Sequence, residues 1–358
     1  MNPYSNLPRQ NFWNASARAQ DALEVDFDSG RKFVFSASDQ FATAGSCFAQ
    51  HFATQLAERG GRVLVAEARH PLVSESSEHG YGLFSARYGN IYTVRQLLEL
   101  LEQAFGLRET VYDMVARPDG RWVDMLRPRA VPMGFASLEH ARADRDYHLH
   151  AVRQMVEKLD VFVFTLGLTE VWINVEHGYC YPVVPGSVAG QFIENRHCFH
   201  NFSFAETVAD LERVIGIVAS NNAMARILFT VSPVGLVATA EQRNVMVSTT
   251  ASKSILRSAV DAVVRSHSSC DYFPSFEIIT SPYSRGKYWA EGLRDVNQSG
   301  INTVMDVFFR SRLPDFQAAA GDAAALTPAH QAHQEELEAA LTEECDEMFL
   351  DPELRSRQ

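Results

Sequence analysis

The chain has 358 residues, of which 46% are hydrophobic and 21% are charged. It is long enough to bury a large core in one domain or two. Its formal net charge of −12 disfavours nucleic-acid phosphate and anionic membrane surfaces as partners, and leaves a small molecule or a neutral glycan open.

The cysteines are odd in number and show no C-x-x-C spacing. This disfavours both a disulfide framework and a zinc site, and favours free thiols in a reducing compartment. The first residues lack a basic start followed by an apolar segment, and no run approaches the roughly 20 apolar residues of a membrane helix. We therefore expect a cytoplasmic protein with no membrane association and no cofactor. The five cysteines are Cys47, Cys180, Cys198, Cys270 and Cys345.

The first strong pattern is a short apolar run, a turn and an amphipathic helix. Residues 41–44 can form a strand, and Phe48 and Phe52 begin a helical spacing of apolar residues. Ser46 then lies on the turn between strand and helix, where Gly45 permits a sharp backbone angle. The unpaired N–H groups of a helix start can stabilise an oxyanion. A serine in this place is a candidate nucleophile or an ordinary N-cap residue.

Strand-like and helical patterns then alternate along the chain, which predicts an α/β fold with a mainly parallel sheet between two helical layers. In such a sheet, sites gather at the carboxyl ends of strands, and Ser46 and Gly167 both lie at such ends. The further strands are expected at 62–66, 161–166, 227–231 and 276–279, and the further helices at 94–105, 143–159, 205–221, 245–266 and 301–310.

Two stretches interrupt this order. Residues 106–140 mix proline, glycine and aromatic residues and read as an insertion or lid, and residues 175–204 read as a second long loop. The composition divides the chain into an N-terminal extension at 1–40, a main domain at 41–313 and an Ala/Glu-rich tail at 314–358, with an amphipathic helix near the C-terminus.

Five short segments of the sequence resemble the GSCFA-domain family, which is grouped with the SGNH, or GDSL-like, hydrolases. The resemblance covers about residues 41–309 and implies a flavodoxin-like three-layer sandwich with a serine nucleophile. The segments are GSCFA at 45–49, TLGLTEVW at 165–172, VSPVGL at 231–236, SKSILR at 252–257 and YFPSFEII at 272–279.

The resemblance assigns roles to particular residues. Ser46 takes the place of the nucleophile, and its own N–H is an expected oxyanion donor. Gly89 and Asn90, in the phrase YGNIYT, stand where the superfamily places a second donor. Thr169 stands where many relatives carry an asparagine. A threonine hydroxyl has a shorter reach than an amide, and one such donor is typically worth about 10²-fold in rate or more.

Each assignment has a structural alternative. Gly89 and Asn90 suit a turn, because both residues tolerate positive φ. Thr169 and Glu170 suit the N-terminus of a helix. The neighbouring Cys47 is a second nucleophile by chemistry, and we disfavour it because adjacent residues at a turn point in different directions and the superfamily uses the serine.

The general base does not stand where the resemblance places it. Superfamily members carry a D-x-x-H segment before the last helix, and residues 288–297 contain no histidine. Glu291 or Asp295 could take the acidic place, with Arg294 or Asp295 where histidine would be expected. An arginine cannot accept a proton at ordinary pH, and a carboxylate does so well only when burial raises its pKa.

Histidines elsewhere could supply the base, since an imidazole titrates near neutrality. We rank His200 first and His197 second; both lie in the segment ENRHCFHNF. His70 and His79 precede YGNIYT, and His51 lies one helical turn after Ser46, so we expect it to point away from the pocket.

Two classes of function follow. The first is a serine acyl-esterase or O-acyltransferase acting on an acylated carbohydrate; the carbohydrate comes only from the family's association with polysaccharide biosynthesis. The missing histidine supports the second, a domain that has lost turnover and binds a glycan or a biosynthetic partner. A third, weaker option is a metal-dependent hydrolase using His197 and His200, which lack a third ligand at a recognisable spacing.

Overall fold

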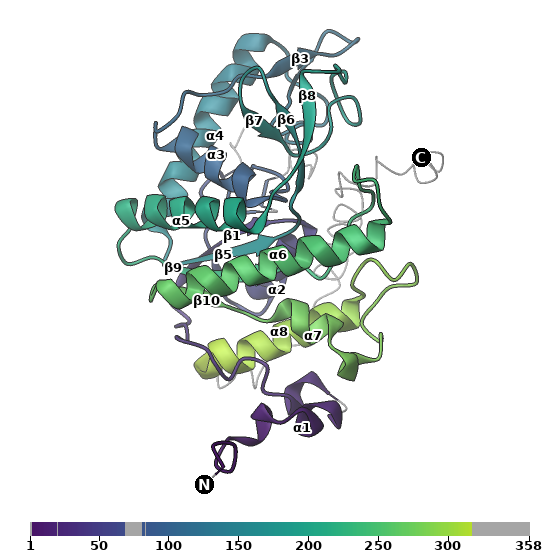
Figure 1. Cartoon of the computed structure of the whole chain (residues 1–358). Coiled ribbons are helices and arrows are strands. Elements are labelled where there is room, and N and C mark those ends of the chain that lie inside the picture. The colour runs from purple at the N-terminus through teal and green to yellow at the C-terminus, as the bar shows by residue number, and fades with distance from the viewer. Residues whose placement is uncertain (1, 20, 69–80, 83, 317–358) are drawn as a thin grey trace, which may run out of the picture.

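The computed structural model describes all residues except 1, 20, 69–80, 83 and 317–358. It is an α/β structure in which a parallel sheet separates two layers of helices, as the sequence predicts (Figure 1). The strands are β1 (Gln40–Gly45), β2 (Arg62–Val63), β3 (Met114–Ala116), β4 (Trp122–Asp124), β5 (Val161–Leu166), β6 (Glu170–Asn174), β7 (Tyr179–Tyr181), β8 (His197–Asn201), β9 (Arg226–Val231) and β10 (Cys270–Tyr272). The helices are α1 (Trp13–Ala17), α2 (Cys47–Glu58), α3 (Val94–Ala104), α4 (Leu138–Lys158), α5 (Phe204–Asn221), α6 (Val245–Ser266), α7 (Ser275–Thr280) and α8 (Gln298–Arg312).

The central sheet has the strand order β10-β9-β5-β1-β2, with every pair parallel. Taken in chain order, its five strands run 2-1-3-4-5, the arrangement of a flavodoxin-like sheet. The strand order reverses between β1 and β5, where Gly45 lies opposite Thr165. Ligands of such sheets bind beyond the carboxyl ends of the strands at this switch point, and the chain places Ser46 and Gly167 there.

Each face of the sheet is covered by its own apolar cluster. On one face, even-numbered residues of β1 and β5, such as Ala44 and Phe164, pack against α3, α4, α5 and α6. On the other face, Phe41 and Val163 pack against α2, α7 and α8. This two-residue alternation is what a strand covered on both sides requires.

The helices begin where polar side chains cap them. Thr93 and Ser203 each form a capping box at the start of α3 and α5, and the Ser137 hydroxyl accepts a hydrogen bond from the His140 N–H at the start of α4. Ser46 also occupies an N-cap position, at α2, but its side chain caps nothing. The helix expected from Phe48 onward is therefore present, and the Ser46 side chain is not used to cap its first turn.

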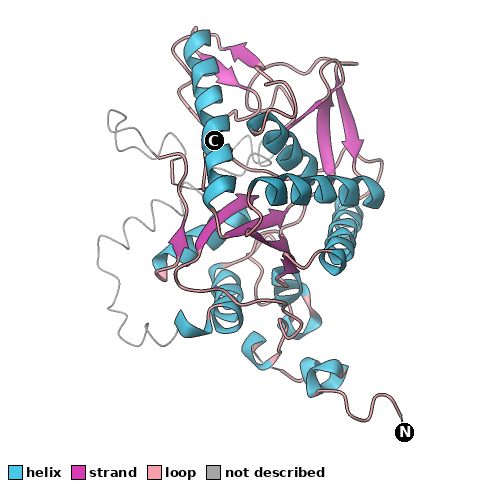
Figure 2. Cartoon of the chain, turned by 90° about the vertical axis from the view of Figure 1, so that its left-hand side faces the viewer, coloured by secondary structure: helices cyan, strands magenta, loops and turns pink. Residues whose placement is uncertain are grey.

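Two small antiparallel sheets stand apart from the central one. β3 and β4 form a ribbon inside the expected insertion 106–140, and β6, β7 and β8 form a three-stranded sheet in the order β7-β6-β8 (Figure 2). Residues 175–204, expected to be one long loop, thus contain two strands. The many glycines and prolines of that stretch lie in the connections, which hid the strands from a reading by composition.

One expected strand is wrong. Residues 276–279 lie within the short helix α7, and the fifth strand of the sheet is β10, immediately before it. A short apolar run does not show by its spacing whether it is a buried strand or a buried helix. The expected strand 62–66 is likewise shorter, since β2 covers only Arg62–Val63.

Residues 22–35, within the expected N-terminal extension, are packed onto the domain rather than separate from it. Ala22 and Phe35 are buried in the same cluster as α2 and α8. Arg312, at the end of α8, is fully buried and pairs with Asp28 at 2.6 Å and with Asp271 at 2.5 Å. The tail helix expected beyond residue 314 lies outside the described residues, and none of the helices within them is long and apolar enough to cross a membrane.

Candidate active site at the switch point

Ser46 occupies the corner that the sequence predicts, between the end of β1 and the start of α2. Gly45 before it has φ +144°, and a Cβ at that position would lie 2.5 Å from the Thr165 carbonyl oxygen. Only glycine fits there. The Ser46 side chain is 5% exposed, and its Oγ is buried with no hydrogen-bond partner in the described part of the chain. Such orphaned hydroxyls are rare and call for an explanation.

The YGNIYT segment lies across the ends of β1 and β5. The Ile91 N–H donates to the Gly45 carbonyl at 2.8 Å, and the Tyr92 carbonyl accepts from Gly167 N–H at 3.0 Å and Leu168 N–H at 2.9 Å. These bonds fix the segment that carries Gly89 and Asn90 at the ends of β1 and β5, next to the corner that holds Ser46.

Gly89 and Asn90 have the features of a turn as well as those of a site. Gly89 adopts φ +69°, and no atom lies within 4 Å of where its Cβ would be. Asn90 is 5% exposed and accepts a hydrogen bond from Gln50 Nε2 of α2 at 3.3 Å. Both readings of the sequence are therefore present in one segment, and the donor role stays a prediction.

Thr169 belongs to a buried polar network. Its Oγ1 lies 2.6 Å from Asn201 Oδ1 and 3.1 Å from Ser252 Oγ, and its N–H donates to Ser252 Oγ at 3.0 Å. An amide oxygen only accepts, so the hydroxyl proton of Thr169 is directed at Asn201. The alternative reading as a helix cap is wrong, because Glu170 begins strand β6.

Two residues of the SKSILR segment reach the same edge, which the sequence did not reveal. Ser252 holds the Thr169 N–H, and Lys253 donates from Nζ to the Gly167 carbonyl at 2.6 Å. Lys253 is only 3% exposed, an unusual place for a lysine. The sequence did not predict this role of Lys253. The apolar spacing of α6 predicts which face of the helix is buried, but not that one end of this face reaches the switch point of the sheet.

The described contacts of the candidate bases lead away from Ser46. His200 Nε2 lies 2.9 Å from Glu206 Oε1 of α5, and His197 Nδ1 accepts from the Ile193 N–H at 3.1 Å. Asp295 is paired with the exposed-loop neighbour Arg294 at 2.7 Å. In β8, His200 and His197 stand on opposite faces of the small sheet, since residues three apart alternate. Their catalytic roles stay predictions.

The remaining histidine candidates add little. His70 and His79 lie outside the described residues. His51 lies on α2, and burial lowers its pKa to about 4. Among the described residues, no group of three or more His, Cys, Asp or Glu side chains could hold a metal ion, so His197 and His200 have no third partner there.

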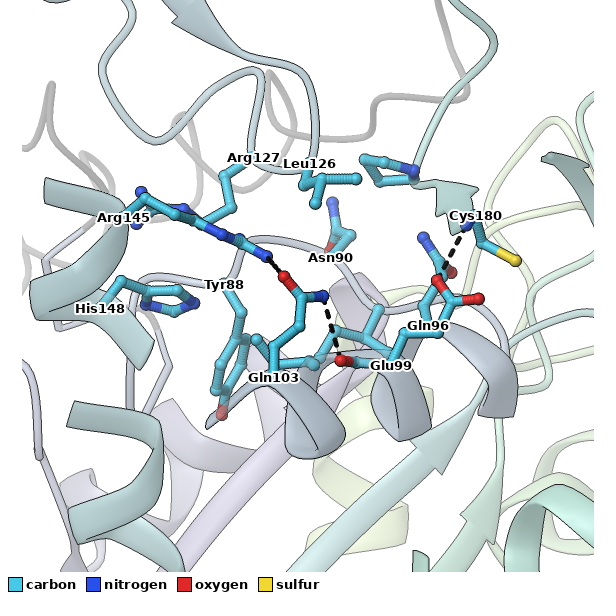
Figure 3. A pocket seen from close by; sticks show the side chains of 13 residues that line it. Tyr88, Asn90, Gln96, Glu99, Gln103, Leu126, Arg127, Arg145, His148 and Cys180 are labelled. Carbon is cyan, nitrogen blue, oxygen red and sulfur yellow. Dashed lines mark hydrogen bonds between the residues drawn. The ribbon is translucent and has the colours of Figure 1, made fainter. Parts of the chain in front are cut away.

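A small polar cavity lies behind Asn90 (Figure 3). Its volume of about 40 Å³ is the scale of a few water molecules. His148 Nδ1 binds Glu67 Oε2 at 2.7 Å, and Arg145 donates to Gln103 Oε1 at 3.0 Å. The fully buried His148 has no hydrogen-bond partner for its Nε2 in the described part of the chain. The interior thus contains an imidazole ring oriented by a carboxylate, which the sequence did not predict.

A larger cavity, of about 230 Å³, opens where the central sheet meets the β6-β7-β8 sheet. Its wall includes Leu168, next to Thr169, and Leu236, which ends the VSPVGL segment after β9. The cavity therefore lies beyond the carboxyl ends of β5 and β9 and is large enough to admit part of a substrate. Ser46, beyond the end of β1, is not among its lining residues.

A comparison with protein families agrees with this geometry. The family model described as the GSCFA family matches residues 40–308. No curated protein and no solved structure gives a significant match. The matched range spans the central sheet, the Ser46 corner and the segments that converge on it. The chain belongs to the GSCFA family.

Proposed function

We propose that the protein is a serine-dependent acyl-esterase or O-acyltransferase of the SGNH type, acting on an acylated carbohydrate. The observation that carries the proposal is the convergence of Ser46 with the 88–92 and 167–169 segments at the switch point of a flavodoxin-like sheet, tied by the Ile91 and Tyr92 backbone bonds. The carbohydrate substrate is what the family resemblance implies.

The chemistry assigned to these residues is acyl transfer. The Ser46 Oγ attacks the ester carbonyl carbon while a base takes its proton, and the carbonyl oxygen becomes an oxyanion that needs N–H donors. The first turn of α2, for which Ser46 is the N-cap residue, would supply such donors and a partial positive charge. The acyl group then passes from Oγ to water or to a second hydroxyl, which regenerates the serine.

The base remains the open role in this proposal. His200, His197 and Asp295 are the sequence candidates, and each now has another described partner. Lys253 is a fourth candidate for this role. It is buried at the carboxyl end of β5, where its Nζ donates a hydrogen bond to the Gly167 carbonyl. A buried lysine can act as a base or as a fixed charge.

Replacement of the nucleophile tests the proposal. Ser46→Ala should reduce turnover of a short-chain ester such as p-nitrophenyl acetate to the rate in buffer, with the circular dichroism spectrum and melting temperature kept. Cys47→Ala is the matched control, because it removes the neighbouring thiol, and it should retain turnover. Wild-type turnover in the Ser46→Ala variant would reject Ser46 as the nucleophile.

A second function has its own supporting observation. The Ser46 Oγ is buried and has no acceptor among the described residues, as expected of a domain that has lost turnover and binds a glycan or a biosynthetic partner. Saturable glycan binding by wild type, with no ester turnover above the Ser46→Ala variant, would favour this function over the first.

A further inference from the structure

A row of aromatic side chains crosses the three-stranded sheet beside the site. Trp172 of β6 lies directly opposite Tyr181 of β7 and Phe199 of β8, and residues opposite each other in antiparallel strands share a face. The centroids of the Trp172 and Phe199 rings are 5.7 Å apart, and the ring planes are inclined at 60°. All three line the cavity of about 230 Å³, and Trp172 and Phe199 are partly exposed at it.

A polar row follows on the same face, two residues closer to the central sheet. Glu170 of β6 lies opposite Asn201 of β8, about 7 Å from the aromatic row. Glu170 accepts hydrogen bonds from Thr239 Oγ1 at 2.7 Å and from the Ala240 N–H at 3.4 Å. Asn201 contacts Thr169. The order along this face is thus polar groups first, then aromatic rings. Glu170 of the polar row lines the cavity, and Asn201 is not among the lining residues.

The charge of the lining selects against anions. Among the described residues that line this cavity, Glu170 carries the single formal charge, and no lysine or arginine is present. Burial raises the pKa of Glu170, while the Thr239 hydrogen bond opposes that rise. An anionic ligand would meet this carboxylate with no cation on the wall to offset the repulsion.

The polar row also argues against a purely apolar ligand. Pocket ligands are held by hydrophobic and aromatic walls together with a few placed polar groups. Glu170 already accepts hydrogen bonds from Thr239 and Ala240, but an ionised carboxylate can accept about four. A fatty acyl chain would cover the remaining acceptor sites without offering them a donor, which costs free energy for each unmet site. A ring that carries hydroxyls on its edge and C–H groups on its faces satisfies both rows.

We propose that this cavity binds a neutral pyranose, with its face on Trp172 and its hydroxyls on the Glu170 carboxylate. The inference rests on the proposed function for what happens to the ligand, since it makes this pyranose the glycosyl part of the acylated substrate. The binding itself does not depend on Ser46.

Binding is measured on the full chain carrying Ser46→Ala, so that no turnover is involved. The probes are methyl glucopyranoside, methyl mannopyranoside and methyl galactopyranoside, with methyl glucuronopyranoside as the anionic match and hexyl acetate as the apolar match. We expect at least one neutral glycoside to bind saturably by calorimetry, at least tenfold more tightly than the glucuronoside and the hexyl ester.

Variants then locate the site. Trp172→Ala should weaken glycoside binding at least tenfold, and Trp172→Phe should weaken it less than threefold. The control is Trp13→Ala, at a tryptophan of the N-terminal segment that is 72% exposed; it should leave glycoside binding unchanged. Glu170→Gln removes the carboxylate charge and should reduce the ratio of the dissociation constant of the glucuronoside to that of the neutral glycoside. The Trp172→Phe variant guards against loss of fold in Trp172→Ala.

The inference is overturned if no neutral glycoside binds, if the glucuronoside or hexyl acetate binds as tightly, or if Trp172→Ala leaves glycoside binding unchanged. Its failure is separate from that of the proposed function. Glycoside binding without ester turnover by the wild type contradicts the esterase alone, and Ser46-dependent turnover without glycoside binding contradicts the pyranose site alone.

Discussion

Gly45 and Gly89 lie on the two segments that meet beside Ser46, and both adopt positive φ in different surroundings. A Cβ on Gly45 would press on the Thr165 backbone at 2.5 Å, whereas a Cβ on Gly89 would meet nothing within 4 Å. At Gly45 a side chain is excluded because β1 and β5 approach each other closely. At Gly89 there is space for a side chain, and only the positive φ favours glycine.

This difference predicts unequal costs for the same substitution. Gly89→Ala should lower the free energy of unfolding by about 1–2 kcal/mol, the strain of a left-handed residue. Gly45→Ala should lower it by at least about 3 kcal/mol, because overpacking adds to that strain. Urea denaturation followed by circular dichroism measures both, and an equal or larger loss for Gly89→Ala would contradict the close contact at Gly45.

At the scale of elements, a buried charged cluster fixes the β3-β4 ribbon to α4. Arg127 beside β4 pairs with Asp144 at 2.8 Å, and Arg145 of α4 lies 3.8 Å from Asp124. His148 joins the same cluster through Glu67. The residues 106–140 are thus held by ion pairs in the interior, where removal of one partner is costly.

This cluster predicts loss of stability in acid. Burial and the nearby Arg127 lower the pKa of His148 from 6.5 to about 4. A lowered pKa stabilises the fold fully above pH 6.5, and this contribution is lost as the pH falls from 6.5 to 4; it amounts to about 3 kcal/mol. Burial would raise the pKa of Glu67, but His148, Arg127 and the Arg87 N–H together lower it to about 2, so acid acts on Glu67 in the same direction below pH 4.5.

The measurement compares wild type with His148→Gln. Unfolding free energies from urea titrations between pH 7.5 and 4 should fall more steeply for the wild type, by about 3 kcal/mol over the range, since glutamine does not titrate. Parallel curves for the two proteins would show that His148 is not held neutral in the fold.

The elements also show what the sequence could and could not foretell. The Ser46 corner was predictable because a strand, a glycine and a helix follow one another within a dozen residues. The network of Thr169, Asn201 and Ser252 was not, because its members come from three distant segments and meet only through the fold. The aromatic row of β6-β7-β8 was missed for the same reason.

On the scale of the whole molecule, the N-terminal segment and the last described helix are joined by Arg312. This fully buried side chain binds both Asp28 and Asp271. Burial raises the pKa of Asp28, and the Arg312 pairing opposes that rise. The family match begins at residue 40. The apolar cluster between the sheet and helices α2, α7 and α8 nevertheless includes Ala22 and Phe35, which precede residue 40.

Removal of Arg312 should therefore destabilise the entire domain. Arg312→Met leaves two buried carboxylates without their cation and should cost about 3–5 kcal/mol of unfolding free energy. Ser299→Ala, at an exposed residue of the same helix, should change it by less than about 0.5 kcal/mol. Thermal and urea unfolding measure both variants, and a similar small effect for the two would show that the N-terminal segment is not part of the cooperative fold.

The central claim is that Ser46 is a reactive nucleophile. The direct measurement is intact-mass spectrometry after incubation with a serine-directed fluorophosphonate, followed by peptide mapping. The account predicts one covalent adduct, on Ser46, that is absent from Ser46→Ala and retained in Cys47→Ala. A wild-type protein that takes up no label, or a Ser46→Ala variant that takes up as much as the wild type, would contradict it.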